Sequence, residues 1–428
     1  MTIVGLDDTD SRSQGMCTTY VAAQLAERLG REAAVQRCCL VRLNPAIPYK
    51  TRGNAALAVH TDVAPARAYD IARELVADHA IADDPATNPG LVVASIDAER
   101  PEATPAPLAT FSERALREEL TIETATELCR AHELRFEGWG DGRGVVGALA
   151  AVGAWRLWAD IGEPPTHELI RYREPKRWGT ERTVDHESVF TAAAAAYPLV
   201  WDTVDRVAGE PVCVPHTPGP VLYGIRGDEL AACQRVAAAV ESEPVAREAA
   251  FLTNQGTDAH LRAGQLGTTT DGRSYRLEGT VEVGPDTQAG GHVFLTIGDG
   301  TDQLPCVAFE PTKRFRAHVR ALRVGDELTV AGERSEGTLK LEKFAVRSLQ
   351  RTALVTPTCG GCGRRMESAG RDQGYRCRDC GTSAPGKTRA AIDRELEPGW
   401  YEVPPVARRH VAKPLVRGGF DAPTHPAR

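Results

Sequence analysis

The sequence predicts an α+β protein built from several domains, because three different patterns follow one another along its 428 residues. The first 272 residues carry two successive β-α-β-β-α-β patterns, which are typical of ferredoxin-like α/β sandwiches. From residue 273 the chain changes to short strands separated by glycine-containing turns, as in a small β-barrel. Two Cys-x-x-Cys pairs then indicate a compact metal-binding module. A chain of this length can give each domain its own buried core.

The first pattern occupies residues 1–162. We expect a strand from Thr2, a helix over 18–29, strands near 35–43 and 55–60, a helix near 66–78 and a strand near 91–96. A helical segment around 113–132, a glycine-rich loop and an apolar helix over 145–158 then complete the domain.

The second pattern occupies residues 163–272 and has the same order of elements. We expect a strand near Leu169, a helix from Asp185 to Tyr197, strands near Val200 and Val221, a helix over 229–240 and a strand over 249–252. The two patterns share no obvious sequence repeat, so the predicted similarity is one of architecture.

The third pattern, over residues 273–352, predicts an OB-fold β-barrel. Its five strands are expected at 275–283, 292–297, 304–309, 327–331 and 339–346. A short helix near 313–322 follows the third strand, which is the order that an OB-fold requires.

Composition limits the possible functions. No segment approaches the run of about 20 apolar residues that a membrane-spanning helix needs, and the N-terminus lacks a secretory pattern. The formal net charge of -7 argues against a generally basic nucleic-acid binder, so any such contact must come from local patches. We therefore expect a cytoplasmic protein with no membrane association and no obligate protein partner.

Four of the eleven cysteines form two pairs, Cys359 with Cys362 and Cys377 with Cys380. Each pair of thiolates fits one tight turn, and four thiolates complete a tetrahedral zinc site. Redox pairing is the alternative. The spacing favours a structural zinc ribbon over residues 353–390, and a tail rich in Pro, Gly and Arg follows over 391–428.

Three aspartates, Asp7, Asp8 and Asp10, follow directly after the first predicted strand. Converging carboxylates need a cation to offset their repulsion, which suggests binding of Mg²⁺ and a nucleotide. A simple Asp-rich turn explains them about as well. Thr18 begins the next helix, where backbone N–H groups favour a phosphate, but it is equally explained as a helix cap.

Lys50, Arg52 and Asn54 surround a glycine in a polar turn between two predicted strands. A triphosphate or an RNA backbone suits such a turn, although isolated basic turns are usually only solvated. Gly142 and Gly144 match a dinucleotide fingerprint by letter, but no apolar strand precedes them, so we reject a Rossmann fold and keep an anion site at the following helix.

The second domain contains two strand-to-loop segments, 217–227 and 253–258, that are rich in glycine and hydrogen-bonding groups. Such segments suit the pocket of a small polar ligand, and a cationic ligand would need a carboxylate such as Asp258 or Asp228. Turn chemistry is the alternative reading.

In order and joint presence, the motifs GLDDTDS, GMCTTY, KTRGNA and NQGTD, followed by an OB-fold and a zinc ribbon, resemble the archaeal agmatidine synthetases, the TiaS family, over nearly the whole chain. The resemblance implies an ATP-dependent C–N ligase. In that family a kinase-like first domain phosphorylates the 2-oxo group of the wobble cytidine of isoleucine tRNA, whose anticodon is CAU. Agmatine then displaces the phosphate, and the product permits decoding of AUA codons.

The resemblance also implies roles for individual residues. Asp7, Asp8 and Asp10 match the acidic motif for Mg²⁺ and ATP, and Thr18 matches a phosphorylatable threonine. The ATP-binding set is expected to include Asp7, Asp8, Lys50, Arg52, Asn54, Gly142 and Gly144. Tyr223, Asn254 and Asp258 are the expected agmatine contacts. The OB-fold and ribbon are expected to bind tRNA, with basic contacts at Arg314, Arg316, Arg408, Arg409, Lys413 and Arg417.

Two other readings remain. An OB-fold and a zinc ribbon are sufficient for a non-catalytic protein that binds single-stranded nucleic acid, although this reading leaves the N-terminal half unexplained. A different ATP-dependent RNA kinase or ligase could use the same acidic motif. ATP hydrolysis that depends on tRNA excludes the first alternative, and the mass of the product separates the second.

Overall fold

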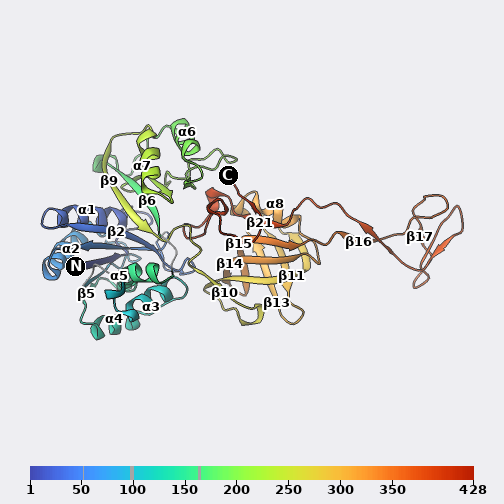
Figure 1. The fold of residues 1–428 in the computed structure, drawn as a ribbon, viewed down its shortest axis with the longest axis horizontal. Helices are drawn as coiled ribbons and strands as arrows, with labels where there is room; N and C mark the ends of the chain where they lie inside the picture. The colour runs from blue at the N-terminus through green and yellow to red at the C-terminus, as the bar shows by residue number, and fades with distance from the viewer. Residues whose placement is uncertain (52, 97–100, 162–164) are drawn as a thin grey trace.

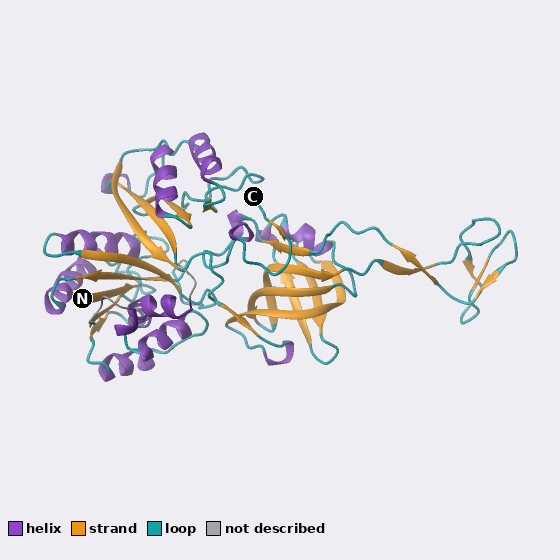
Figure 2. Ribbon diagram, in the orientation of Figure 1, coloured by secondary structure: helices purple, strands orange, loops and turns teal. Residues whose placement is uncertain are grey.

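The computed structural model describes residues 1–51, 53–96, 101–161 and 165–428. Two α/β units lie side by side at one end of the molecule, a β-barrel follows, and a narrow extension projects from the far side of the barrel (Figures 1 and 2). Among the described helices, none is both long and apolar enough to cross a membrane.

The first unit has the predicted order of elements. These are β1 (Thr2–Asp7), α1 (Thr18–Gly30), β2 (Val35–Arg42), β3 (Ala55–Thr61), α2 (Pro65–His79) and β4 (Gly90–Ser95). The strands pair antiparallel in the order β4-β1-β3-β2. Alternate residues of β1 serve two cores, because Ile3 packs on the side of α5 (Gly144–Ile161) and Val4 packs with α1.

One prediction in this unit was wrong. The expected helical segment around residues 113–132 is two helices, α3 (Ala106–Ala115) and α4 (Ile122–Ala131). Thr121 separates them by capping α4, since its side chain accepts a hydrogen bond from the backbone N–H of Thr124. The short β5 (Arg135–Gly138) then pairs antiparallel with β4, which places no parallel β-α-β unit at the glycine-rich turn.

The second unit repeats this order and is continuous with the first. Its elements are β6 (Thr166–Arg173), α6 (His186–Ala196), β7 (Val200–Trp201), β8 (Val221–Gly227), α7 (Leu230–Ala239) and β9 (Val245–Thr253). The strand order is β9-β6-β8-β7, and β9 pairs parallel with β2. The two predicted sandwiches therefore share one nine-stranded sheet.

The five predicted barrel strands are present and close on themselves. They are β11 (Arg273–Thr287), β12 (Val293–Gly298), β13 (Gln303–Ala308), β14 (Glu327–Ser335) and β15 (Thr338–Ser348). The ladder runs β11-β12-β13-β15-β14 and returns to β11. The short β10 (Leu261–Ala263) pairs parallel with β11, and α8 (Phe315–Arg320) follows the third barrel strand.

The extension consists of a two-stranded stalk and a small module. β16 (Thr352–Val355) pairs antiparallel with β20 (Thr388–Ala391), and the segment between these strands, residues 356–387, forms the far tip of the molecule (Figure 1). This segment contains the four cysteines. The strands of this module are β17 (Glu367–Ser368), β18 (Tyr375–Arg376) and β19 (Ser383–Ala384).

The C-terminal segment corrects the prediction of a basic tail. Residues 399–428, here called the strap, return from the stalk to the barrel, where β21 (Gly399–Glu402) pairs with β15 and β22 (Thr424–His425) pairs with β21. The strap then runs between the barrel and the α/β units (Figure 1).

Most of the basic side chains that were predicted to contact RNA form ion pairs within the protein. Arg408 pairs with Asp202 and Glu402, Arg409 with Glu333 and Arg417 with Asp228. Arg314 pairs with Asp205, and Arg316 with Glu310. Asp202, Asp205 and Asp228 belong to the second α/β unit, so these pairs hold that unit against the barrel and the strap.

Replacing Arg408 with alanine is therefore expected to destabilise the protein by about 3–5 kcal/mol, because two buried carboxylates lose their partner. Only 4% of the Arg408 side chain is exposed. Urea unfolding measures the difference. The matched control is Arg67→Ala, which removes a solvent-exposed pair with Glu32 and should change the stability much less. Equal effects of the two substitutions would show that the strap is not fixed by this pair.

Candidate active site

A cavity of about 600 Å³ lies where the two α/β units, the α4 segment and the strap meet. Its lining includes Asp7, Asp8, Asp10, Thr18, Lys50, Asn54 and Gly144. These residues come from separate motifs of the sequence, and the fold brings them to one place. Arg52 lies outside the described residues, and Gly142 is not part of the lining.

The acidic end of the cavity is formed by the turn after β1. Asp8 has a left-handed backbone (φ 55°) and accepts a hydrogen bond from the backbone N–H of Asn88 at 2.8 Å. Burial raises the pKa of Asp8 to about 6, and burial together with repulsion from Asp8 raises the pKa of Asp7. Burial and mutual repulsion both disfavour the ionised carboxylates, and a bound cation would offset these two effects.

Asp7 has its place because α5 has a glycine opposite it. A Cβ atom on Gly147 would lie 1.8 Å from the Oδ2 atom of Asp7. Only glycine therefore lets the helix approach the carboxylate this closely. Another glycine, Gly144, starts the helix, and its N–H donates to the carbonyl of Asn88 at 2.9 Å.

Thr18 is the first residue of α1, and the preceding Cys17 occupies the cap position. The interpretation of Thr18 as a helix cap was therefore wrong. Its hydroxyl oxygen instead accepts hydrogen bonds from the backbone N–H and the hydroxyl of Thr9, at 3.3 and 3.1 Å. These bonds hold the hydroxyl at the wall of the cavity, beside the acidic turn.

The polar turn between β2 and β3 contributes Lys50 and Asn54. The ammonium of Lys50 donates to the carbonyls of Pro45 and Ile47, and burial lowers the pKa of Lys50. The amide of Asn54 donates to the carbonyl of Asn44 at 2.8 Å. Both side chains line the cavity and also hold the shape of their own turn.

The three residues predicted to bind agmatine do not line the cavity. The hydroxyl of Tyr223 donates to the carbonyl of Ala237. Asn254 exchanges two hydrogen bonds with the backbone of Arg42. The carboxylate of Asp258 accepts from the ammonium of Lys343 at 2.7 and 2.8 Å. Their polar groups are committed to the fold, so sequence proximity to a loop did not place them in the pocket.

Sequence reasoning missed a charged cluster that does line the cavity. Arg42 ends β2, Glu168 lies in β6, Arg226 lies in β8 and His410 comes from the strap. The available signal was a charged residue inside an apolar strand, because such a residue must find a partner or a ligand when the strand is buried. No local motif marks these four positions.

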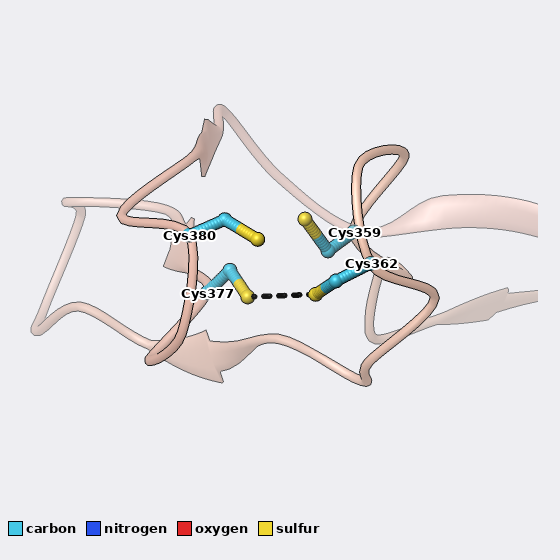
Figure 3. A group of neighbouring side chains, drawn as sticks. All are labelled: Cys359, Cys362, Cys377 and Cys380. Carbon is cyan, nitrogen blue, oxygen red and sulfur yellow. Dashed lines mark hydrogen bonds between the residues drawn. The ribbon is translucent and has the colours of Figure 1, made fainter.

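The four predicted metal ligands are close together. The Sγ atoms of Cys359, Cys362, Cys377 and Cys380 all lie within 4.8 Å of one another, and the side chains converge from two turns (Figure 3). Backbone N–H groups of Gly361 and Cys362 lower the pKa of Cys359 to about 6, which favours the thiolate. The arrangement fits a tetrahedral metal ion with four sulfur ligands. Within the described residues the aspartates form no comparable cluster of three ligands.

Family models match three parts of the chain, described as the TiaS TCKD domain over residues 3–64, the TiaS FLD domain over 142–260 and the TiaS C-terminal zinc ribbon domain over 356–396. The whole chain is 50% identical to the whole 2-agmatinylcytidine synthetase TiaS of Haloquadratum walsbyi, which is named for its isoleucine tRNA substrate. This chain belongs to the TiaS family. The TiaS of Methanosarcina mazei is 45% identical, with 97% of each chain covered.

Solved TiaS structures have the same fold. A complex of TiaS with isoleucine tRNA and ATP matches with a TM-score of 0.89 and 43% identity, covering 100% of this chain and 99% of that one. A complex of TiaS with isoleucine tRNA, AMPCPP and agmatine matches with a TM-score of 0.86 and 40% identity over the same shares. The strap and the stalk lie within the matched length.

Proposed function

We propose that this chain is an ATP-dependent ligase that forms 2-agmatinylcytidine at the wobble cytidine of isoleucine tRNA with the CAU anticodon, and so permits decoding of AUA codons. The observation that carries the proposal is the single cavity that joins the acidic turn, Thr18 and the polar turn, in a chain that is related over its full length to enzymes of that name. The reaction belongs in the cytoplasm, where tRNA is used.

The proposed chemistry has two steps. The γ-phosphoryl group of ATP passes to the 2-oxo oxygen of the cytidine, because that oxygen is otherwise a poor leaving group. The primary amine of agmatine then attacks C2, loses a proton and displaces the oxygen as phosphate. Asp8, whose pKa is raised to about 6, or Asp7, whose pKa is also raised, would accept that proton.

Two metals have separate places in this proposal. Mg²⁺ would be held jointly by the ATP phosphates and one or two of Asp7, Asp8 and Asp10, since these carboxylates do not form a three-ligand site by themselves. It would offset the negative charge that develops during phosphoryl transfer. The four cysteines would hold a structural Zn²⁺, whose closed sulfur shell leaves no position for a substrate.

The domains would divide the work. We propose a kinase-like first domain near residues 1–162 and a ferredoxin-like domain near 163–272, with the active cavity between them. An OB-fold near 273–352 and a zinc ribbon near 353–390 would bind tRNA. Within residues 391–428, which were predicted to be a basic tail, the strap over 399–428 would fix these parts against one another.

Radiolabelled agmatine tests the function. The protein should transfer label to isoleucine tRNA only when ATP is present, and a tRNA with uridine at the wobble position should take up none. Label on the uridine tRNA, or uptake without ATP, would contradict the proposed reaction. A protein that binds tRNA but never hydrolyses ATP would instead be the non-catalytic RNA-binding protein considered above.

The cationic end of agmatine needs a different carboxylate from Asp258. Glu119 and Glu123 are exposed side chains that line the cavity, and a guanidinium binds carboxylates through charge-assisted hydrogen bonds. We expect the double substitution of Glu119 and Glu123 by glutamine to raise the KM for agmatine about tenfold, while the KM for ATP stays unchanged. An unchanged KM for agmatine would place its guanidinium elsewhere.

Loss of zinc should affect tRNA and leave the ATP site intact. Cys377→Ser is expected to release the metal and unfold the ribbon, because structural zinc supplies the folding energy of such modules. The ribbon projects from the barrel on the stalk of β16 and β20, away from the α/β units (Figure 1), so ATP affinity should be unchanged. The affinity for tRNA should fall. The slope of log affinity against log salt concentration should become shallower by just under about one unit for each phosphate that the ribbon no longer binds. Unchanged tRNA affinity would assign RNA binding to the barrel and the α/β units.

A further inference from the structure

Two buried guanidinium groups share one carboxylate at the wall of the cavity. Arg226 lies 3.3 Å from Glu168 (Nε to Oε1), and Arg42 lies 3.8 Å from the other oxygen (Nη2 to Oε2). Side-chain exposures are 9%, 12% and 6% for Arg226, Arg42 and Glu168. The three residues come from β8, β2 and β6, around the line where the two units join in one sheet.

This cluster carries an excess of positive charge. Burial and the neighbouring arginines push the pKa of His410 well below its ordinary value, so its imidazole is neutral. Burial lowers the pKa of Arg42 to about 10, which leaves it charged at neutral pH. Gln255, whose side-chain amide is uncharged, donates to Glu168 and completes the polar surroundings. Among the described residues of this cluster, Glu168 alone offsets Arg42 and Arg226.

Buried polar atoms of the cluster have no partner within the described protein. They include the Nε atom of Arg42, which is a donor, and the Nδ1 atom of His410, and both residues line the cavity; the Oε1 atom of Gln255 is a further one. A buried donor such as Nε of Arg42 costs free energy when it has no partner, and so does a buried charge that is not offset. The two features together indicate an anionic ligand that is present when the enzyme works.

The surrounding residues hold this cluster in place. Asn254 accepts from the backbone N–H of Arg42 at 2.7 Å and donates to its carbonyl at 3.0 Å. Gln255 donates from its side-chain amide to Glu168. The N–H of Gly256 donates to the carbonyl of His410 at 2.8 Å. The NQG motif thus holds Arg42 of the first unit, Glu168 of the second unit and the strap residue His410 in position.

We propose that Arg42 and Arg226 bind a phosphodiester group of the RNA chain next to the cytidine that is modified. The identity of this anion rests on the proposed function. Guanidinium groups match phosphate oxygens in shape and charge. The acidic turn and these arginines line one cavity. A cytidine whose base reaches the acidic turn carries its own backbone phosphates away from those carboxylates, and the arginines offer them a site.

The test removes the charge from one side of the interaction at a time. Isoleucine tRNA is assembled with an uncharged methylphosphonate linkage on the 5′ or the 3′ side of the wobble cytidine, and kcat/KM is measured for each tRNA. In the unsubstituted enzyme one of the two linkages should lower kcat/KM about ten- to a hundredfold, which corresponds to the loss of one charge-assisted hydrogen bond.

Three variants decide whether the cluster binds that phosphate. Arg226→Met should use tRNA with the ordinary phosphodiester and tRNA with the methylphosphonate linkage almost equally. Arg226→Lys should keep most of the preference for the ordinary linkage. Glu168→Gln should increase the discrimination, because it removes the one offsetting charge. A cluster that is only structural would not move the ratio in opposite directions in two variants. Arg67→Met, on the far surface of α2, is the control and should discriminate like the unsubstituted enzyme.

Some outcomes would overturn the proposal. If the unsubstituted enzyme uses tRNA with the ordinary and with the methylphosphonate linkage equally, it does not bind these backbone phosphates through their charge. If Arg226→Met keeps the full preference for the ordinary linkage, residues other than Arg226 bind the phosphate. A raised KM for ATP in Arg226→Met, without any effect of the neutral linkages, would assign the cluster to an ATP phosphate. If the unsubstituted enzyme does not modify ordinary tRNA at all, the proposed function itself fails, and that result is separate from the comparison of linkages.

Discussion

Asp8→Asn is expected to lower the rate of ATP turnover by about a hundred- to a thousandfold, because it removes a charge that would hold Mg²⁺, the ion that would offset the negative charge developing on the phosphate. The fold should tolerate the change. Asparagine adopts the left-handed backbone of this position readily, and its side-chain oxygen can still accept the hydrogen bond from Asn88. Affinity for tRNA should stay close to that of the unsubstituted protein, since the substitution does not touch the ribbon or the barrel.

The same substitution should stabilise the protein near neutral pH. The pKa of Asp8 in the fold is about 6, above the ordinary value of 3.8. A group with a raised pKa favours the fold below the ordinary pKa, and this contribution is lost as the pH rises through the raised value. In the absence of ATP and metal, Asp8→Asn should therefore melt at a higher temperature than the unsubstituted protein at pH 7.5, and the gap should close toward pH 4.

Asp70→Asn, on the exposed face of α2, is the control and should change neither the turnover nor the pH dependence of melting. Full ATP turnover by Asp8→Asn would reduce the acidic segment to an ordinary turn. If the variant is inactive but no more stable at pH 7.5, the ionised Asp8 carboxylate does not destabilise the fold, and its pKa is not raised by burial.

Gly147→Ala is expected to have an effect of similar size on catalysis through a different cause. The added methyl group would lie 1.8 Å from Asp7, so the carboxylate or the helix must move. A displacement of about 1 Å at a catalytic group is enough to cost about a hundredfold in rate. Single-turnover kinetics of phosphoryl transfer measure the loss, and ATP binding should also weaken.

Gly153→Ala provides the matched control on the same helix. Its methyl group would lie 2.2 Å from the backbone carbonyl oxygen of Leu108, so it disturbs the packing of α5 on α3 and does not touch Asp7. We expect lower stability with nearly normal activity per folded molecule. If Gly153→Ala and Gly147→Ala lose activity equally once folding is taken into account, the close approach to Asp7 has no special role.

The elements that the sequence predicted well are those with a strong local pattern. The helix after Asp185 starts where a capping aspartate precedes an apolar repeat, and the helix that begins at Thr18 has a similar apolar repeat. The barrel strands were also recognisable because glycine turns separate alternating residues. The helix break near Thr121 was missed, since one capping residue inside an otherwise helical stretch is a weak signal.

Long-range pairing has no such local signal. The parallel contact of β2 with β9 that joins the two units involves two residue pairs, Cys39 with Leu252 and Leu40 with Thr253. The strap has the composition of a solvated tail, but Arg408 is buried by Asp202, which lies 206 positions earlier in the chain. Neither arrangement follows from the pattern of neighbouring residues.

The candidate site divides along the same line. The aspartates, Thr18 and the two Cys-x-x-Cys pairs lie in compact motifs, so their proximity was predictable. Glu168, Arg226 and His410 are isolated charged or polar residues in three different segments, and only the folded sheet and the strap bring them to one cavity. The residues predicted to bind agmatine, Tyr223, Asn254 and Asp258, lie outside the cavity lining, because their polar groups make hydrogen bonds within the fold.

The nucleoside mass of modified tRNA tests the central proposal most directly. The purified protein is incubated with isoleucine tRNA transcript, ATP, Mg²⁺ and agmatine. The tRNA is then digested, and the masses of its nucleosides are measured by mass spectrometry. We expect a cytidine in which the 2-oxo oxygen has been replaced by agmatine, formed only when ATP and agmatine are both present. A cytidine of unchanged mass, or one that carries phosphate and no amine, would contradict it.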